Sequence, residues 1–305
     1  MKTRVLQDEP GDRRHHVPVD TVPRGEPAGP AWLGGVSSLV RRHALTAFFV
    51  LSCAFSWCLV PVGTFLPFGP LLAALVVVSF TGGRAGLLRL GARLVRWRVG
   101  WVWYVAAVGI PVAVHVAASW LNVGLGASSP SMGQFSPWHA VLVVIGLRLV
   151  DPLDGPLGEE PGFRGYAQPR LQGGLTPLRA TAALAAFVAV WHLPLLLMGA
   201  DGMQPADLVG SVAVTFWYAW LFNHTGGSVL LTVVAHATEG SIQTGSLWAA
   251  GHDASRQTLL YSLVWASVAV ALVVLDRRAW LCAPETAVDP ARRPDLEKAN
   301  PSEKP

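Results

Sequence analysis

The chain has 305 residues, of which 52% are hydrophobic and only 14% are charged. Soluble globular domains carry about a quarter of charged residues, so this composition argues against a water-soluble enzyme and excludes disorder over the whole chain. The formal net charge is +4. A basic balance among so few charges favours a lipid bilayer over nucleic acid as the partner.

The two ends of the chain differ in composition from the part between them. Residues 1–40 and 284–305 are polar and rich in Pro and charged residues, so we predict disordered tails there. Residues 1–40 contain no early apolar segment of the kind that marks a secretory signal peptide. Residues 41–283 form one apolar block without linker composition, which predicts a single transmembrane domain.

The apolar block contains about eight stretches that could each cross a bilayer, which takes about 20 apolar residues in a helix. These stretches are 43–62, 67–82, 101–122, 138–160, 178–199, 206–223, 227–248 and 258–276. The fourth contains the helix-breaking run 151–156, which predicts either a span broken around a wet cavity or a different boundary. We therefore predict an all-α, polytopic membrane protein with about eight transmembrane helices surrounding an intramembrane polar cavity.

The distribution of basic residues predicts the orientation of these spans. With the amino terminus inside, nearly all of the 23 Lys and Arg residues fall on the same side of the membrane. We therefore predict a multi-pass protein of the cell membrane with both termini cytoplasmic. Segment 84–98 places Leu and Trp between arginines, which indicates an amphipathic helix lying on the cytoplasmic leaflet.

Three clusters of ionisable residues lie within the apolar block, where such residues are costly and usually functional. Glu159 and Glu160 are adjacent, and Arg164 follows Glu160 by four residues, which places that pair on one helix face. His192 and His236 each follow an apolar run. At 1.5 Å of rise per residue, all three clusters fall at membrane depth, so they can share one site. The structural alternatives are an interfacial salt bridge and helix–helix hydrogen bonds.

The order of these motifs resembles the CAAX protease and bacteriocin-processing family (CPBP, or Abi) of intramembrane glutamic endopeptidases. The resemblance covers about residues 138–245 and is carried by GEEPGFRGYAQPRLQ, VWHLP and WLFNHTGGSVLLTVVAH. It implies hydrolysis of a peptide or membrane-protein substrate without a cofactor. It also implies that Glu159 is the general base, that Glu160 and Arg164 support and orient it, and that His192 and His236 belong to the catalytic site.

The sequence departs from the family pattern at two positions. Val188 stands where the motif before His192 has Phe, and Gly240 stands where the motif after His236 has Asn. The resemblance implies that this His and Asn stabilise the oxyanion, and losing one such donor costs about 10²–10³ in rate. Reduced or absent activity is therefore one expectation, and Gly240→Asn is expected to preserve or raise activity. The polar residues nearest to Gly240 that could replace the donor are Glu239, Ser241 and Gln243.

Three other functions fit the same residues. Glu159, His192 and His236 have the side chains of zinc ligands, which would make the protein a zinc-dependent membrane peptidase. Gly240 favours a membrane immunity or scaffold protein that binds its partner without cleaving it. A proton-coupled transporter would also use intramembrane Glu and His, but the two halves of the chain show no repeat. Arg148 and Asp151 are interpreted as a structural ion pair.

Overall fold

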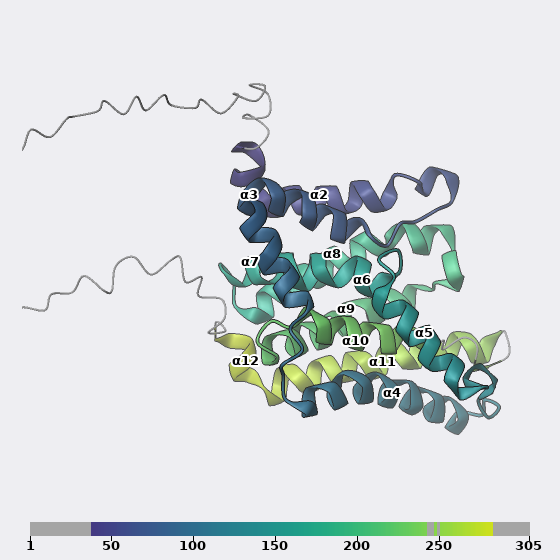
Figure 1. Ribbon diagram of the computed structural model, residues 1–305. Helices are drawn as coiled ribbons and strands as arrows, with labels where there is room; N and C mark the ends of the chain where they lie inside the picture. Colours follow the sequence, from purple (N-terminus) through teal and green to yellow (C-terminus); the bar gives the residue numbers. More distant parts are fainter. Residues whose placement is uncertain (1–37, 243–246, 249–250, 283–305) are drawn as a thin grey trace, which may run out of the picture.

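The computed structural model describes residues 38–242, 247–248 and 251–282 (Figure 1). These described residues form helices and contain no strand, which confirms the all-α prediction. The predicted tail 284–305 lies outside them, and so does the tail 1–40 except for its last three residues. The division into one domain and two tails therefore stays a prediction.

Helices follow one another along the chain with short connections. Their bounds are α2 Ala44–Trp57, η1 Val60–Val62, α3 Gly69–Leu94, α4 Trp101–Gly124, η2 Gly133–Phe135, α5 Trp138–Val150, α6 Gly155–Glu160, η3 Pro161–Ala167, α7 Gln168–Gln172, α8 Pro177–Met198, η4 Ala200–Gly202, α9 Pro205–His224, α10 Val229–Ser241, α11 His252–Leu275 and α12 Arg277–Leu281.

Five helical stretches of the described chain are long and apolar enough to cross a membrane. They are α3, α4, α8, α11 and the stretch Ala44–Val62, which joins α2 to η1. The expected spans 138–160, 206–223 and 227–248 are not among them, so the number of eight is not confirmed. α5 and α10 have 13 residues each, which is short of the roughly 20 that a span needs. α9 coincides closely with the expected span 206–223.

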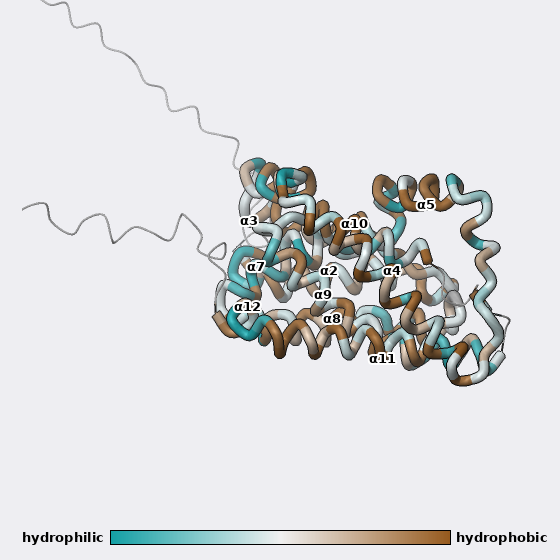
Figure 2. Tube along the Cα trace, turned by 90° about the horizontal axis from the view of Figure 1, so that it is seen from below, coloured by the Kyte–Doolittle hydropathy of each residue, from teal (hydrophilic) through white to brown (hydrophobic). Residues whose placement is uncertain are grey.

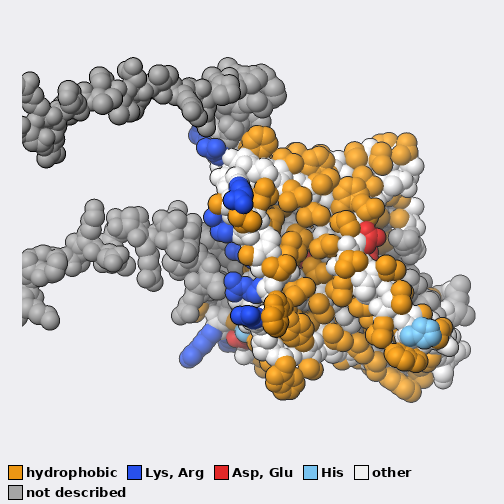
Figure 3. All heavy atoms as spheres, viewed as in Figure 1, with side chains coloured by type: hydrophobic (Ala, Val, Ile, Leu, Met, Phe, Trp, Pro, Cys, Tyr) orange, Lys and Arg blue, Asp and Glu red, His pale blue; other side chains and the backbone are white. Residues whose placement is uncertain are grey.

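The outer surface of the helices is apolar, as a lipid environment requires. Trp101, Leu197 and Leu275 are each more than three-quarters exposed. The face seen in Figure 3 is covered by hydrophobic side chains, and Lys and Arg gather at one end of it. Hydrophilic residues also mark the end that holds α7 and α12 in Figure 2. An apolar surface of this extent, bounded by charge at one end, is that of a membrane protein.

Helix α10 lies inside the bundle rather than at its edge (Figure 1). It packs against α4, α5, α6 and α9, while α9 in turn packs against α8 and α11. The two largest hydrophobic clusters of the described residues lie in this bundle: Trp191 belongs to the one that α8 forms with α2 and α3, and Trp217 and Trp265 to the one formed by α4, α9, α10 and α11. The short α10 therefore has protein neighbours on several sides.

Helix α3 is longer than the expected span 67–82 because it continues to Leu94 through the predicted amphipathic segment. Gly83 has a φ of 53° and kinks the helix at the expected boundary. Glycine adopts this left-handed conformation without the steric cost of a side chain. The kink therefore lies where the sequence predicted the end of the span, although helical hydrogen bonding continues from there to Leu94.

The fourth expected stretch is interrupted at the helix-breaking run, while its predicted alternatives, a span broken around a wet cavity or a different boundary, stay open. α5 ends at Val150, and α6 begins at Gly155 after a turn. Asp154 caps α6, because its Oδ1 accepts a hydrogen bond of 2.7 Å from the Gly155 backbone N–H. Pro161 lacks an N–H group, and from this residue the helix continues as a π-helix of seven residues, Pro161–Ala167. Wide turns of this type are frequent at functional sites.

The glycines of the first motif allow this broken segment to lie directly against α3. A Cβ atom on Gly162 would lie 2.4 Å from the Pro70 carbonyl oxygen, and one on Gly158 would lie 3.0 Å from the Phe68 Cα. Only the absence of side chains at these positions permits such close helix contact. This packing leaves Glu160 and Arg164 buried against α10 rather than exposed at an interface.

Candidate active site

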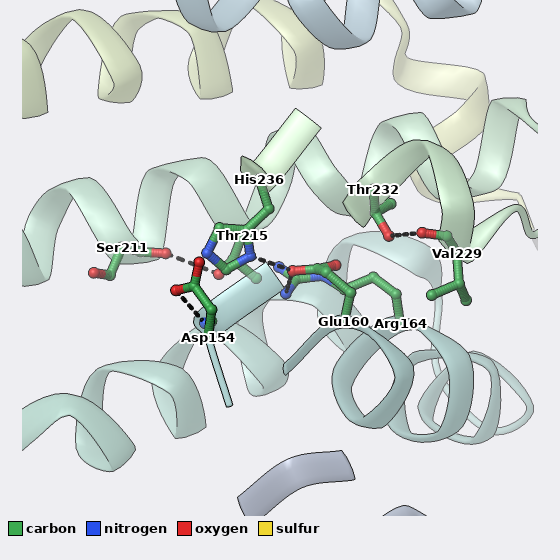
Figure 4. A network of polar contacts seen from close by, with 9 residues as sticks. Asp154, Glu160, Arg164, Ser211, Thr215, Val229, Thr232 and His236 are labelled. Atoms are coloured by element: carbon green, nitrogen blue, oxygen red, sulfur yellow. Dashed lines mark hydrogen bonds and ion pairs between the residues drawn. The ribbon is translucent and has the colours of Figure 1, made fainter. Parts of the chain in front are cut away.

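Three of the predicted site residues form one buried polar network (Figure 4). The Oε1 of Glu160 accepts a hydrogen bond of 3.0 Å from Arg164 Nη1 and lies 3.0 Å from Nδ1 of His236. The Glu160 side chain is 0% exposed and that of Arg164 is 3% exposed. The predicted pair on one helix face therefore exists, and it links the first motif to the histidine of the third. Because the pair is buried, losing either partner would leave an uncompensated charge.

His236 is held in place by the turn that begins its helix. Gly226 and Gly227 have φ values of 62° and 84°, which the chain needs to reverse direction between α9 and α10. The Ser228 hydroxyl donates to the Arg96 carbonyl over 2.7 Å and accepts from the Leu231 N–H over 3.3 Å. These contacts fix the start of α10 two turns before His236.

Tyr218 of α9 is a site residue that the sequence analysis missed. Its ring stacks on the imidazole of His236, with centroids 5.3 Å apart and planes at 21°. The Arg164 guanidinium carbon lies 4.9 Å from the centre of the same ring. Tyr218 thus completes the enclosure of the Glu160 network. A phenol inside an apolar span is the signal that could have identified it, because buried Tyr usually serves a polar partner.

His192 reaches the site from α8. Its Nδ1 donates to the Val188 carbonyl over 2.8 Å, because a carbonyl oxygen can only accept. The neighbouring Trp191 anchors the helix to α2: its Nε1 donates to the Ser56 hydroxyl over 2.9 Å, and its carbonyl accepts from Trp57 Nε1 over 3.1 Å. With Nδ1 protonated, Nε2 is the nitrogen of the neutral imidazole that can accept a proton.

The family motif has Phe at the position of Val188, and the structure shows what Val188 and the neighbouring Phe187 contact. The Val188 side chain lines the cavity described below. The Phe187 ring instead packs against Phe49, with centroids 4.4 Å apart. The motif position therefore keeps an apolar side chain at the cavity wall, and the phenylalanine one residue earlier stabilises the contact between α8 and α2.

Glu159, Arg164, His192 and His236 line one cavity of about 180 Å³. Glu160 lies behind this wall and contacts His236 from the protein interior. Gly155 borders the site: a Cβ atom on this residue would lie 3.0 Å from Oε1 of Glu159 and 3.4 Å from Nε2 of His236. The reactive atoms of these two side chains therefore face the same point. The structure brings the five predicted residues together from α6, η3, α8 and α10.

The remaining wall of the cavity contains further polar residues, most of which were not predicted. It includes Asp207, Ser211, Thr215, Tyr218, Glu239 and Tyr261. The Tyr261 hydroxyl donates to Oε1 of Glu239. Of the three residues proposed to replace the motif asparagine, Glu239 thus lines the cavity but is engaged by Tyr261. Ser241 donates back to the Ala237 carbonyl over 2.5 Å, and Gln243 lies outside the described residues.

Arg148 pairs with a different carboxylate from the one expected. Its Nε lies 3.2 Å from Oδ2 of Asp154, not beside Asp151. Asp151 instead accepts a hydrogen bond of 2.9 Å from the Leu153 N–H within the turn. The helix ends at Val150, so spacing along a helix no longer determines which carboxylate meets the arginine.

The zinc alternative has no arrangement to support it in the described part of the chain. No group of three His, Cys, Asp or Glu side chains there is placed to hold a metal ion. Nδ1 of His192 and Nδ1 of His236 both have protein partners. Zinc binding by Glu159, His192 and His236 stays an alternative that metal measurement addresses.

The comparisons with known proteins agree with the motif order. Residues 137–242 match a family model described as Rce1-like, type II CAAX prenyl endopeptidase Rce1-like. No curated protein matches the chain. The matched segment runs from α5 to α10 and contains the five predicted site residues. The matched family is one of proteases, and over residues 137–242 the comparison supports the resemblance to the CAAX protease and bacteriocin-processing family that the motif order predicted.

Proposed function

We propose that the protein is an intramembrane endopeptidase that hydrolyses a peptide or membrane-protein substrate with a water molecule activated by Glu159. The observation that carries this proposal is the convergence of Glu159, His192 and His236, from three helices, on one cavity among membrane-spanning helices. Peptide hydrolysis needs a water nucleophile, a base and donors for the oxyanion, and these side chains can supply each part.

Glu159 and His192 activate the water in this mechanism. A carboxylate and an imidazole nitrogen facing one cavity can both accept hydrogen bonds from the same water molecule. Glu159 takes one proton, the water oxygen bonds to the scissile carbonyl carbon, and the carbonyl electron pair moves to its oxygen. The proton then passes to the leaving nitrogen as the C–N bond breaks. The Nδ1–H bond of His192 to Val188 leaves its Nε2 available as the acceptor.

His236 stabilises the charge that develops on the carbonyl oxygen. Its Nδ1–H is held by Glu160, and a protonated imidazole then presents Nε2–H toward the side of the site where Glu159 lies. The buried Glu160 carboxylate compensates the imidazolium charge, as the aspartate of a serine-protease triad does for its histidine. Arg164 fixes Glu160 in the orientation that this contact needs.

The membrane setting defines what the substrate must be. A site lined by residues of α6, α8, α9 and α10 is reached by a peptide segment at or within the bilayer rather than by a free globular protein. We infer a multi-pass protein of the cell membrane with both termini cytoplasmic and with no cofactor and no nucleic-acid partner. The basic residues gathered at one end of the molecule support this orientation (Figure 3).

Proteolysis by the full-length protein in liposomes tests the proposal. Membrane-anchored peptides, with and without a prenylated carboxyl terminus, are incubated with wild type, Glu159→Gln and His192→Ala, and with Asp276→Asn as the matched carboxylate control. Asp276 pairs with His224, far along α9 from the cavity. Loss of a general base lowers the rate about 10²–10⁴-fold, so we expect that loss for Glu159→Gln and none for the control.

Three outcomes would contradict this mechanism. Cleavage that depends on stoichiometric zinc and disappears with a chelator would favour the zinc peptidase. Full cleavage by Glu159→Gln would contradict the assigned base. Retained partner binding and retained cellular phenotype in that variant, without cleavage by wild type, would identify the protein as a binding or immunity protein.

A further inference from the structure

The position of the missing motif asparagine is occupied by another side chain. Gly240 lies on α10, four residues after His236. A Cβ atom on Gly240 would lie 2.5 Å from Nη2 and 2.9 Å from Cζ of Arg148. Real Cβ atoms do not approach other atoms so closely. The guanidinium of Arg148, the far end of a flexible side chain, therefore occupies this space and has to move before another side chain can enter it.

Arg148 is held there by the residue that starts the helix of the catalytic glutamate. It lies in the last turn of α5, which packs against α10. Its Nε is 3.2 Å from Oδ2 of Asp154, while Oδ1 of the same carboxylate caps α6 through the Gly155 N–H. The Arg148 and Asp154 side chains are 25% and 29% exposed. The guanidinium is thus paired with this carboxylate, while its Nε is buried and the side chain as a whole is partly exposed.

This guanidinium lies beside α10, about one helical turn beyond His236. Residues four apart in a helix share a face, so position 240 is the neighbour of His236 along α10. Asp154 is followed by Gly155, the residue whose Cβ position lies 3.0 Å from Glu159 and 3.4 Å from His236. Arg148 is not among the residues that line the cavity, and it approaches position 240 from α5. A carbonyl oxygen placed between His236 and position 240 would meet its Nη groups.

We propose that Arg148 supplies, from α5, the hydrogen-bond donors that the motif asparagine would supply from α10, and that Gly240 makes room for it. This inference rests on the peptidase function proposed above. When the water oxygen bonds to the scissile carbon, the negative charge on the carbonyl oxygen is met by His236 and by the Nη groups of Arg148. A guanidinium is permanently charged and carries several N–H donors, which suits it to an oxyanion.

A set of full-length variants in liposomes separates this role from simple packing. Arg148→Ala is expected to lose about 10²–10³-fold in kcat/KM, chiefly in kcat, as when one oxyanion donor is removed. Gly240→Asn is also expected to lose activity, because the asparagine and the guanidinium compete for one space and neither donor is then held in a fixed position. This reverses the expectation drawn from the motif alone. The double variant Arg148→Ala/Gly240→Asn is expected to recover at least tenfold over Arg148→Ala, because the asparagine then has space and offers its own donor.

Arg148→Ala/Gly240→Leu is the matched control, since leucine fills a similar volume without a donor. It is expected to remain as inactive as Arg148→Ala. Wild-type activity in Arg148→Ala would overturn the proposal. Equal recovery of activity in the leucine and asparagine double variants would also overturn it, because Arg148 would then act only through packing. No recovery of activity in the asparagine double variant would overturn it as well.

Thermal unfolding in detergent tests the occupied space without reference to activity. Gly240→Asn should lower the melting temperature slightly, because the displaced Arg148 loses its ion pair with Asp154, and this loss should be absent in the double variant, where position 148 is already alanine. The melting-temperature changes of the two single variants could instead simply add in the double variant. In an enzyme whose cleavage depends on Glu159, that result would overturn only the claim that Arg148 occupies the space at position 240. Absence of Glu159-dependent cleavage in wild type would overturn the peptidase function and the donor role together. A non-additive change in melting temperature would even then show that Arg148 occupies the space at position 240.

Discussion

The two halves of the broken fourth span, α5 and the segment from α6 to α7, are consecutive in the chain but opposite in environment. α5 has no buried residue, and Leu147 on it is 60% exposed. In α6 and η3, Glu159, Glu160 and Arg164 are buried, and glycines press the backbone against α3. The difference indicates that the segment from α6 to α7 holds the two carboxylates rigidly. Helix α5 is peripheral and carries Arg148.

Removing Arg164 should have the largest effect on folding. Arg164→Met leaves the fully buried Glu160 without its guanidinium partner, and breaking a buried ion pair in this way costs about 3–5 kcal/mol. Chemical or thermal unfolding in detergent measures the loss. Replacing both partners, as Glu160→Leu/Arg164→Met, should restore a large part of it. A single variant as stable as wild type would show that the α6–α7 segment is not the rigid half.

The glycine contacts of the same segment predict the next largest effect. Gly162→Ala places a Cβ atom 2.4 Å from the Pro70 carbonyl oxygen, and this is backbone that cannot rotate away. Overpacking of this kind costs about 1–3 kcal/mol. Gly91→Ala on α3 is the control, because a Cβ atom there meets nothing within 4 Å. Equal melting temperatures for the two variants would mean that η3 and α3 are not in close contact.

The junction between the halves should give a smaller change. Asp154→Ala removes the cap of α6 and the partner of Arg148, and loss of a helix cap costs about 0.5–2 kcal/mol. Asp154→Asn keeps a capping oxygen and should keep most of the stability. Because Arg148 loses its ion-pair partner in both variants, both should lower kcat. A loss of kcat confined to Asp154→Ala would attribute the effect to the cap alone.

The peripheral half predicts the smallest effect. Leu147→Ala on α5 removes a side chain that is 60% exposed, so stability should change by about 0.5 kcal/mol or less. Leu184→Ala on α8 is the matched comparison, because that leucine is completely buried and its truncation costs about 2–5 kcal/mol. Melting curves of the two variants in the same detergent give the contrast. Similar losses would show that α5 is packed as tightly as the bundle.

Much of the architecture followed from patterns that are local in the chain. Apolar length predicted α4 and α8 within two residues of their observed ends, and the run of Asp, Pro and Gly predicted the break before α6. The pairing of Glu160 with Arg164 followed from helical spacing, and the motif order identified the residues that meet at the cavity. These features depend on periodicity or on backbone restrictions, which the sequence displays directly.

The parts that escaped prediction depend on contacts between distant elements. Arg148 meets Asp154 rather than Asp151 because the turn after Val150 redirects the chain. Tyr218 joins the site only because α9 packs beside α10. Gly240 was interpreted differently for the same reason. In the sequence it is the loss of a motif side chain, whereas in the structure the guanidinium of another helix lies at that position. No local pattern encodes which helices become neighbours.

The π-helical turn Pro161–Ala167 makes the site depend on chain length as well as on residue identity. Beyond this turn, Gln168 donates to the Ala219 carbonyl over 3.2 Å and so ties α7 to α9. Each residue of a regular helix turns the chain by about 100°. Deleting one residue within the wide turn would change the phase of α7 relative to α6 by about that angle. Gln168 would then lose its contact with α9, although both glutamates kept their positions. The number of residues between the glutamates and Gln168 therefore matters as much as their identity.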